Sequence, residues 1–296
     1  MLNKLALFVS IVVLSLFYYY VYVLNVDYEK ENFIREIDNG LLFTKNLFEE
    51  EQRYALTIST LISQDAEFLK AYSEDDRKKT FDIVNRKIKD LSYLDGAKIE
   101  VQVHDKNANT YLRSWDFEVK DIPLSSFREG LVLVSKTKKR VVSVEVGKRL
   151  NIKAISPILQ ENELRGSIEV IIGFEHLQNK LLAQGYTMLI LLDKKYLDIA
   201  TELKDNPIIK DKFVLVNEVD DEQAISYLLN CDLSVLGSYG YFQNKNASFG
   251  YFGLNNLHNE RIGYCVLALK SQNSSPLKKH YLEHKIEQDI QGVIIR

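Results

Sequence analysis

The chain begins with an uncharged apolar run of 20 residues, Leu5 to Leu24, and this run constrains the fold more than any other feature. At the helical rise of about 1.5 Å per residue it covers about 30 Å, the thickness of a bilayer's hydrocarbon core. Lys4 precedes the run, whereas Asp27 and Glu29 follow it. Because positive residues stay on the cytoplasmic side, we expect a single-pass anchor over residues 1–25, with the N-terminus in the cytoplasm and the body outside the membrane.

A cleaved signal peptide is the alternative to an anchor. The apolar region of a signal peptide usually has about 7–15 residues and ends at a small-x-small cleavage site. Here the run is longer and ends in the segment from Tyr18 to Leu24, which has no such site and is rich in the tyrosines that favour membrane interfaces. We therefore favour an uncleaved anchor.

The composition excludes several classes of protein. With 46% hydrophobic residues and a formal net charge of −3, the chain is neither a disordered tail nor a basic nucleic-acid binder. Cys231 and Cys265 do not form a disulfide framework. In an oxidising compartment they could form one bridge, and two buried thiols are the equal alternative.

A long helical pattern follows the anchor. Apolar residues recur every seven positions from Ile34 to Ile62, and no proline interrupts the stretch from Val26 to about Phe68. This pattern predicts a stalk helix packed either on its own domain or on a twin helix, which would give a homodimer. A second helix is expected from Glu74 to about Leu94, with Ser73 and Asp76 as a capping arrangement. The helical region spans residues 26–95.

From Lys98 the pattern changes to the alternation of β-strands, interrupted by short helices. We predict an α+β fold with antiparallel sheets in two modules, residues 96–184 and 185–270, followed by a polar tail, residues 271–296. The predicted helices are Pro123–Lys138, begun by the proline or capped by Ser125, then Phe174–Gln184 and Glu222–Leu229. The predicted strands are Ile99–His104, Thr110–Trp115, Val141–Gly147, Leu150–Ile158, Leu164–Gly173, Thr187–Leu192, Phe213–Val216, Tyr239–Phe242, Ala247–Leu254 and Arg261–Leu269.

Alternation gathers charged and aromatic side chains on the strands of the first module. Two cations, two carboxylates and aromatic rings would suit a pocket for a small zwitterion or carboxylate, because arginine holds a carboxylate through two parallel hydrogen bonds and an acidic group holds an ammonium. The equal alternative is the solvent-exposed face of a one-sided antiparallel sheet. The residues are Tyr111, Arg113, Trp115, Glu145, Lys153 and Glu169.

Catalytic and metal-binding motifs are absent from the sequence: it has no nucleophile elbow, no phosphate-binding glycine loop and no His-Glu-x-x-His. We expect no enzyme, no cofactor and no metal. His104, next to Asp105, is interpreted as a turn residue. His280 and His284 have helical i, i+4 spacing, but neighbouring glutamates favour an exposed helix over a metal site.

Five segments of the first module, in a fixed order, resemble the extracytoplasmic double Cache sensor domains of bacterial chemoreceptors and sensor kinases. The resemblance implies PAS-like modules, one membrane-distal and one membrane-proximal, and adds Arg128 to the expected ligand-binding residues. The segments are Tyr111-Leu-Arg-Ser-Trp115, Leu124-Ser-Ser-Phe-Arg128, Val144-Glu-Val-Gly147, Ile155-Ser-Pro-Ile158 and Arg165-Gly-Ser-Ile-Glu169.

The sequence departs from that family at three points. Asp121-Ile-Pro123 stands where the family carries a glycine and paired aspartates, and Lys153 stands where it has an arginine. Because lysine lacks arginine's planar fork, the ligand is expected to differ or to bind less tightly. Receptors of the family also continue into a second span and a signalling domain, which this sequence does not show.

The leading hypothesis is a sensor module anchored in a bacterial inner membrane, with its body in the periplasm. It would bind a small carboxylate or amino acid and signal through a separate partner protein. The alternative is a degenerate Cache-fold subunit that serves interaction or assembly in an envelope complex and binds no metabolite. A third possibility is a partial gene product whose signalling half lies in the next reading frame.

Overall fold

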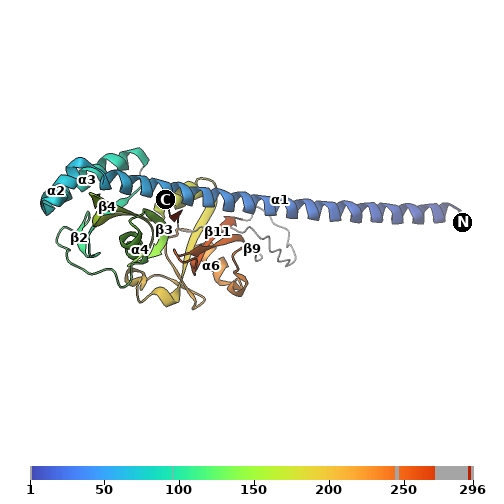
Figure 1. Cartoon of the computed structure of the whole chain (residues 1–296). Coiled ribbons are helices and arrows are strands. Elements are labelled where there is room, and N and C mark those ends of the chain that lie inside the picture. The colour runs from blue at the N-terminus through green and yellow to red at the C-terminus, as the bar shows by residue number, and fades with distance from the viewer. Residues whose placement is uncertain (1, 96, 244–246, 271–292, 295–296) are drawn as a thin grey trace.

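The computed structural model describes residues 2–95, 97–243, 247–270 and 293–294. Its dominant element is one helix, α1 (Leu2–Ser63), which extends as a rod far beyond the folded body (Figure 1). Phe8–Asn25 is the one stretch of the described chain long and apolar enough to cross a membrane, and none of it is buried. The predicted anchor and stalk are therefore one continuous helix.

The C-terminal half of α1 packs against both sheets of the body. The residues of the seven-residue repeat from Leu41 to Ile62 are buried, and the helix contacts strands of both sheets. Of the two predicted uses of this apolar stripe, packing on the chain's own sheets is the one that accounts for its burial.

Two short helices follow, α2 (Ala66–Ser73) and α3 (Arg77–Asp95). The long helix ends earlier than predicted because Asp65 caps α2, accepting a hydrogen bond from Phe68 N at 2.9 Å. The predicted capping role of Ser73 is wrong. Its hydroxyl donates to Lys70 O, and Asp76 caps α3 by accepting from Lys79 N at 3.0 Å.

The first sheet has six strands in the order β12-β3-β4-β5-β1-β2, and every pair is antiparallel. Part of the predicted tail contributes to it, because Val293–Ile294 pairs with Val141 and Val142. The rest of that tail, with His280 and His284, lies outside the described residues. The strands are β1 (Ile99–Asp105), β2 (Thr110–Arg113), β3 (Val141–Val146), β4 (Leu150–Gln160), β5 (Glu163–Ile172) and β12 (Val293–Ile294).

The helix that covers this sheet, α4 (Glu129–Thr137), begins later than predicted. Pro123 does not start it, and no side chain of the described chain, Ser125 included, caps it. Residues 121–124 are instead bound to the β1–β2 hairpin: Thr110 N donates to Ile122 O at 2.9 Å, and Leu124 N donates to Ala108 O at 3.2 Å. Asp121 has a positive φ of 58°, which no helix start would require.

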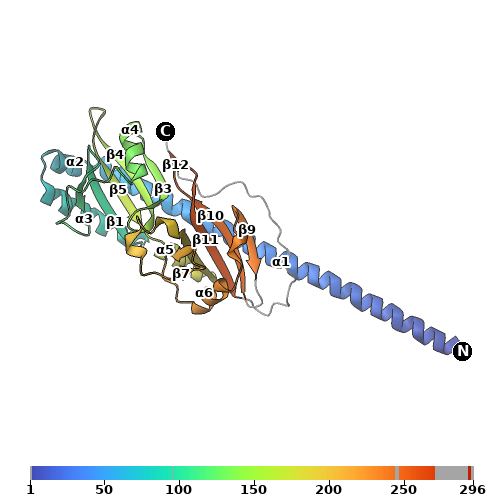
Figure 2. The ribbon, with the colours of Figure 1, turned by 90° about the horizontal axis from the view of Figure 1, so that it is seen from below.

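The second sheet has the order β7-β8-β6-β11-β10-β9 and lies beside the first along α1 (Figure 2). Helix α5 (Glu175–Leu182) connects the two sheets, and α6 (Glu222–Leu229) covers the face of the second sheet opposite α1. Cys231 and Cys265 are both free and buried, so the buried-thiol alternative is confirmed. The strands are β6 (Tyr186–Asp193), β7 (Ile208–Ile209), β8 (Phe213–Leu215), β9 (Tyr239–Gln243), β10 (Ala247–Asn255) and β11 (Arg261–Lys270), with short 3-10 helices at Lys194–Tyr196, Thr201–Leu203 and Leu233–Val235.

Candidate functional site

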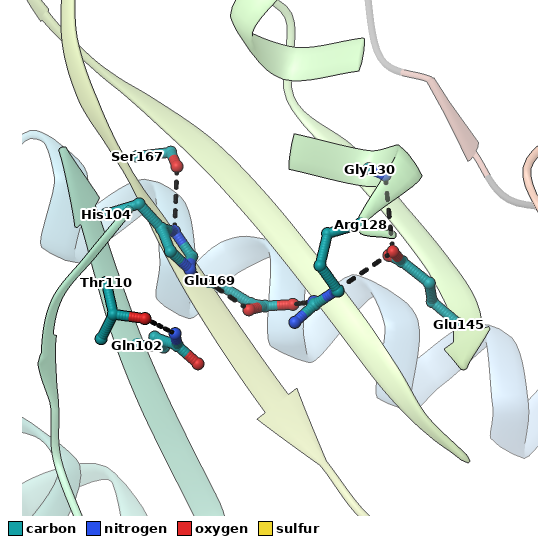
Figure 3. Close-up of polar contacts among 8 residues, drawn as sticks. All are labelled: Gln102, His104, Thr110, Arg128, Gly130, Glu145, Ser167 and Glu169. Carbon is teal, nitrogen blue, oxygen red and sulfur yellow. Dashed lines mark hydrogen bonds and ion pairs between the residues drawn. The ribbon is translucent and has the colours of Figure 1, made fainter. Parts of the chain in front are cut away.

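The two faces of the first sheet have opposite character. The face toward α1 carries the apolar core, including Val101, Val103 and Ile168. Alternation therefore places the polar residues of the same strands on the other face, where the start of α4 at Gly130 lies beside Glu145 (Figure 3). This polar face is buried: Glu169 has 0% exposure. The predicted alternative of a solvent-exposed face is wrong.

Arg128 is at the centre of this face. It occupies the N-cap position of α4 and is buried, and its guanidinium pairs with carboxylates from two strands (Figure 3). Nε donates to Glu145 Oε1 at 3.4 Å, and Nη2 donates to Glu169 Oε1. Burial alone would lower the pKa of Arg128, but Glu169 and Glu145 outweigh it and raise that pKa. The three side chains form a buried cluster with one more negative than positive charge.

The start of α4 completes the surroundings of Glu145. Gly130 N donates to Glu145 Oε1 at 3.5 Å, and the helix N-terminus favours the nearby negative charge. A side chain at Gly130 would meet Glu145 Oε2 at 2.8 Å. Glycine therefore allows the helix to approach the strand this closely.

His104 extends the cluster toward β1. Its Nδ1 lies 3.1 Å from Ser167 Oγ, and its Nε2 lies 3.6 Å from Glu169 Oε2. Burial lowers the pKa of His104 to about 3, so the imidazole is neutral at neutral pH and its contact with Glu169 is not an ion pair. The tautomer that suits both contacts has the proton on Nε2, facing the carboxylate, with Nδ1 accepting from the serine. The interpretation of His104 as a turn residue is wrong.

Lys153 lies on the same face, directly opposite Ser143 on β3. It is buried, and no carboxylate of the described chain lies within 4 Å of its Nζ. Burial and the charge of Arg128 lower the pKa of Lys153 to about 8, although Glu145 and Glu169 act in the opposite direction. The ammonium thus stays mostly protonated at neutral pH while lacking a close partner.

Arg113 marks the more open end of the face. It lies opposite Gln102, which in turn lies opposite Glu169, so one row crosses β2, β1 and β5. The guanidinium is half-buried, its Nε has no hydrogen-bond partner in the described chain, and burial lowers its pKa. Trp115 lies 5.7 Å from it in a cation–π contact and is 44% exposed.

Two of the predicted aromatic residues lie elsewhere than expected. Trp115 is beyond the end of β2, because the turn bond from Asp116 N to Arg113 O at 3.3 Å ends the strand. Tyr111 lies at the bulge of the β1–β2 pair, and its ring packs against Tyr72 of α2 on the opposite side of the sheet. Tyr111 therefore does not share the face of Arg113.

The structure thus brings together Arg128, Glu145, Glu169 and Lys153, with Arg113 at the edge of the group. The sequence interpretation missed His104 and the pair Gln102–Thr110, whose side chains are joined at 2.8 Å. The alternation of Gln102 and His104 with the valines of β1 was the available signal.

Among the described residues, no group of acidic, histidine and cysteine side chains could hold a metal ion.

Several polar atoms of this face are buried without a hydrogen-bond partner in the described chain, and each unsatisfied atom is costly. Glu145 Oε2, Glu169 Oε2 and Ser143 Oγ are acceptors, and Arg113 Nε is a donor. The arrangement offers acceptors for an ammonium group near β3 and β5 and a donor for a carboxylate near β2.

The fold is that of a double sensory domain. A family model described as the double sensory domain of two-component sensor kinases matches residues 30–208. The chain belongs to this family, and the predicted resemblance to double Cache domains is confirmed. No curated protein matches the chain.

Two solved structures are among those similar to this chain. The sensor domain of the V. cholerae histidine kinase DctB is 14% identical with a TM-score of 0.50, and the match covers 82% of this chain and 99% of that one. The ligand-binding domain of the Campylobacter jejuni chemoreceptor Tlp3, in complex with L-valine, is 15% identical with a TM-score of 0.47, covering 81% of this chain and 94% of that one.

Proposed function

We propose that this protein is a membrane-anchored periplasmic sensor module that binds a small amino acid or carboxylate on the polar face of its first sheet. The observation that carries the proposal is the buried cluster of Arg128, Glu145 and Glu169, beside which acceptor atoms remain unsatisfied. Burying charge is expensive unless every group is paired, and a ligand would complete the pairing.

The row across the sheet suits a zwitterion. Neighbouring strands lie about 4.8 Å apart, so Arg113 on β2 and Glu169 on β5 are separated by about 10 Å at the backbone. Both side chains can reach inward over that distance. The ammonium would take the free oxygens of the two glutamates, and the carboxylate would take the fork of Arg113.

The apolar segment of α1 and the membership in a family of sensory domains support the proposed location in a membrane. Phe8–Asn25 would span a bacterial inner membrane, and the charge bias around it favours a cytoplasmic N-terminus. The sensory helices and sheets occupy the described chain from α1 to Lys270. We also propose that the signal passes to a separate partner protein.

A second candidate function, an interaction or assembly subunit without a metabolite ligand, is favoured by one observation. Arg128, which the family resemblance assigned to the ligand, is already paired with two carboxylates of its own chain. In that case the cluster fastens α4 to the sheet, and the face needs no ligand.

A ligand screen on the full-length protein in detergent separates the two functions. An amino acid or short organic acid at about 100 times its Kd adds roughly 2.7 kcal/mol of stability, which raises Tm by several degrees. Arg113→Ala should abolish the shift. Glu145→Gln should weaken the binding of amino acids more than the binding of organic acids that lack an ammonium group. Arg53→Ala is the matched control, because that arginine is exposed on α1.

The assembly function predicts that no compound of the screen raises Tm. Under either function Arg128→Met should strand two buried glutamates and cost about 3–5 kcal/mol in the absence of any ligand, so the ligand response is what separates the two functions. Lys153→Arg is the informative gain-of-function variant. A ligand response that appears only in this variant would show that the unmodified chain has lost the sensing role.

A further inference from the structure

A cleft of about 750 Å³ lies on the opposite side of the first sheet, between α2 and the ends of β1, β2, β4 and β5. Helix α2, which contributes four of its lining residues, is at the end of the body farthest from the N-terminus (Figure 1). We propose that this cleft is a second ligand site, which takes a carboxylate with an apolar or aromatic body. Its volume is within the range of small-molecule sites, about 300–1,000 Å³.

Apolar and aromatic side chains form part of the lining of the cleft. They are Leu69 and Tyr72 of α2, Tyr111 of β2, and Ile158 and Leu159 of β4. The Tyr72 and Tyr111 rings meet edge to face, with centroids 4.9 Å apart. A planar or aliphatic ligand body would bury apolar surface against all of these side chains.

The aromatic wall is fixed before any ligand arrives. The Tyr72 hydroxyl shares its one proton between two backbone carbonyls, His104 O at 3.2 Å and Arg165 O at 2.9 Å. Gly166 makes this possible, because a Cβ there would overlap both the Tyr72 hydroxyl and His104 O. A preformed wall spares a ligand the entropic cost of ordering it.

Two cations of the lining could pair with an anion. Lys70 of α2 and Arg165 of β5 come from opposite walls. In the described chain Lys70 has no carboxylate within 4 Å, and the ion-pair partner of Arg165 is the exposed Glu163 at 3.7 Å. A ligand carboxylate between the two cations would meet both.

One of the two acidic residues of the lining, Asp105, is already engaged. Both Asp105 oxygens accept hydrogen bonds within the β1–β2 turn, from Asn107 N, Asn109 N and Asn109 Nδ2. Asp75 is the other acidic residue of the lining. Asp105 therefore has both carboxylate oxygens occupied, whereas Lys70 has no ion-pair partner among the described residues.

The test uses phenylacetate as the probe, with ligand-observed NMR on the full-length protein in detergent and empty micelles as the blank. We expect saturable binding with a Kd of about 1 mM or tighter. Lys70→Gln combined with Arg165→Gln should weaken it about tenfold or more, and Leu159→Trp should block it. The neutral analogue 2-phenylethanol should also bind at least about tenfold less tightly. Lys139→Gln, at an exposed lysine, is the matched control and should change nothing.

Three results would overturn the proposal. These are no saturable binding of phenylacetate, binding that the double variant leaves unchanged, or tighter binding of phenethylamine than of phenylacetate. The proposal stands independently of the site on the polar face. Arg113→Ala, which removes the proposed amino-acid response on the other side of the sheet, should leave phenylacetate binding intact.

Discussion

At the scale of single residues, the polar face shows how burial decides the state of a titratable group. His104 and Glu169 lie 3.6 Å apart with no exposed area, yet the histidine is neutral because burial and Arg128 both oppose its protonation. Arg128 remains charged because two carboxylates contact it. On one face of the sheet, His104 is thus neutral while the nearby Arg128 is charged.

The His104 environment predicts acid sensitivity. Its pKa is about 3 when folded and about 6.5 when unfolded, so the unfolded chain binds the extra proton and stability is lost as pH falls through this window. The loss is about 1.4 kcal/mol per pH unit below 6.5, or about 2 kcal/mol at pH 5. His104→Gln, which keeps a donor near Glu169, should lose less stability between pH 7 and pH 5.

Urea unfolding of both proteins at the two pH values measures this difference. His258→Gln is the matched control, because His258 is exposed. This variant should lose as much stability between pH 7 and pH 5 as the parent chain does. An equal acid loss in the parent and in His104→Gln would show that His104 is not the group responsible.

At the scale of elements, alternation predicted the strands well and the starts of helices poorly. Strand patterns depend on a local period, so the faces carrying Glu145 and Glu169 were predictable. The start of α4 was not, because Pro123 and Ser125 are common at helix starts but here a tertiary contact with the β1–β2 hairpin holds the backbone extended. The pairing of Arg128 with two strands is likewise a tertiary property, which no spacing in the sequence contains.

The junction between α2 and the sheet provides a prediction at this scale. Gly166→Ala should push Tyr72 away from the carbonyls of His104 and Arg165, because the added methyl would overlap the hydroxyl and the backbone. We expect a loss of about 1–3 kcal/mol, the usual cost of overpacking. Gly173→Ala is the matched control, since a Cβ there would meet one atom, at 3.9 Å. Equal unfolding free energies for the two variants would contradict the fit described for Tyr72.

At the scale of the whole molecule, the two sheets are joined through α1 rather than through a broad contact of their own. Helix α1 contacts β4 and β5 of the first sheet and β10 of the second. Gly250 of β10 lets the helix come close, because a Cβ there would lie 2.7 Å from Ile37 and 2.9 Å from Leu41. The helix is therefore part of the core of both sheets.

For the full chain, we predict a membrane topology with the C-terminus in the periplasm. A reporter enzyme that is active only in the periplasm, fused after Arg296, should be active, and carbonate washing should leave the protein in the membrane fraction. Activity from a cytoplasmic reporter alone would reverse the proposed orientation. A soluble product with a new N-terminus near Asn25 would instead identify the apolar run as a signal peptide.

The continuity of α1 makes it a lever. At about 1.5 Å per residue, Asn25 lies about 45 Å along the helix from Ala55, which is buried against the body. A tilt of the body by about 5° would therefore displace the helix at Asn25 by about 4 Å, a distance comparable with one helical turn. A change too small to alter the fold of either sheet would thus reach the level of the apolar segment as a movement large enough for a neighbouring helix to detect.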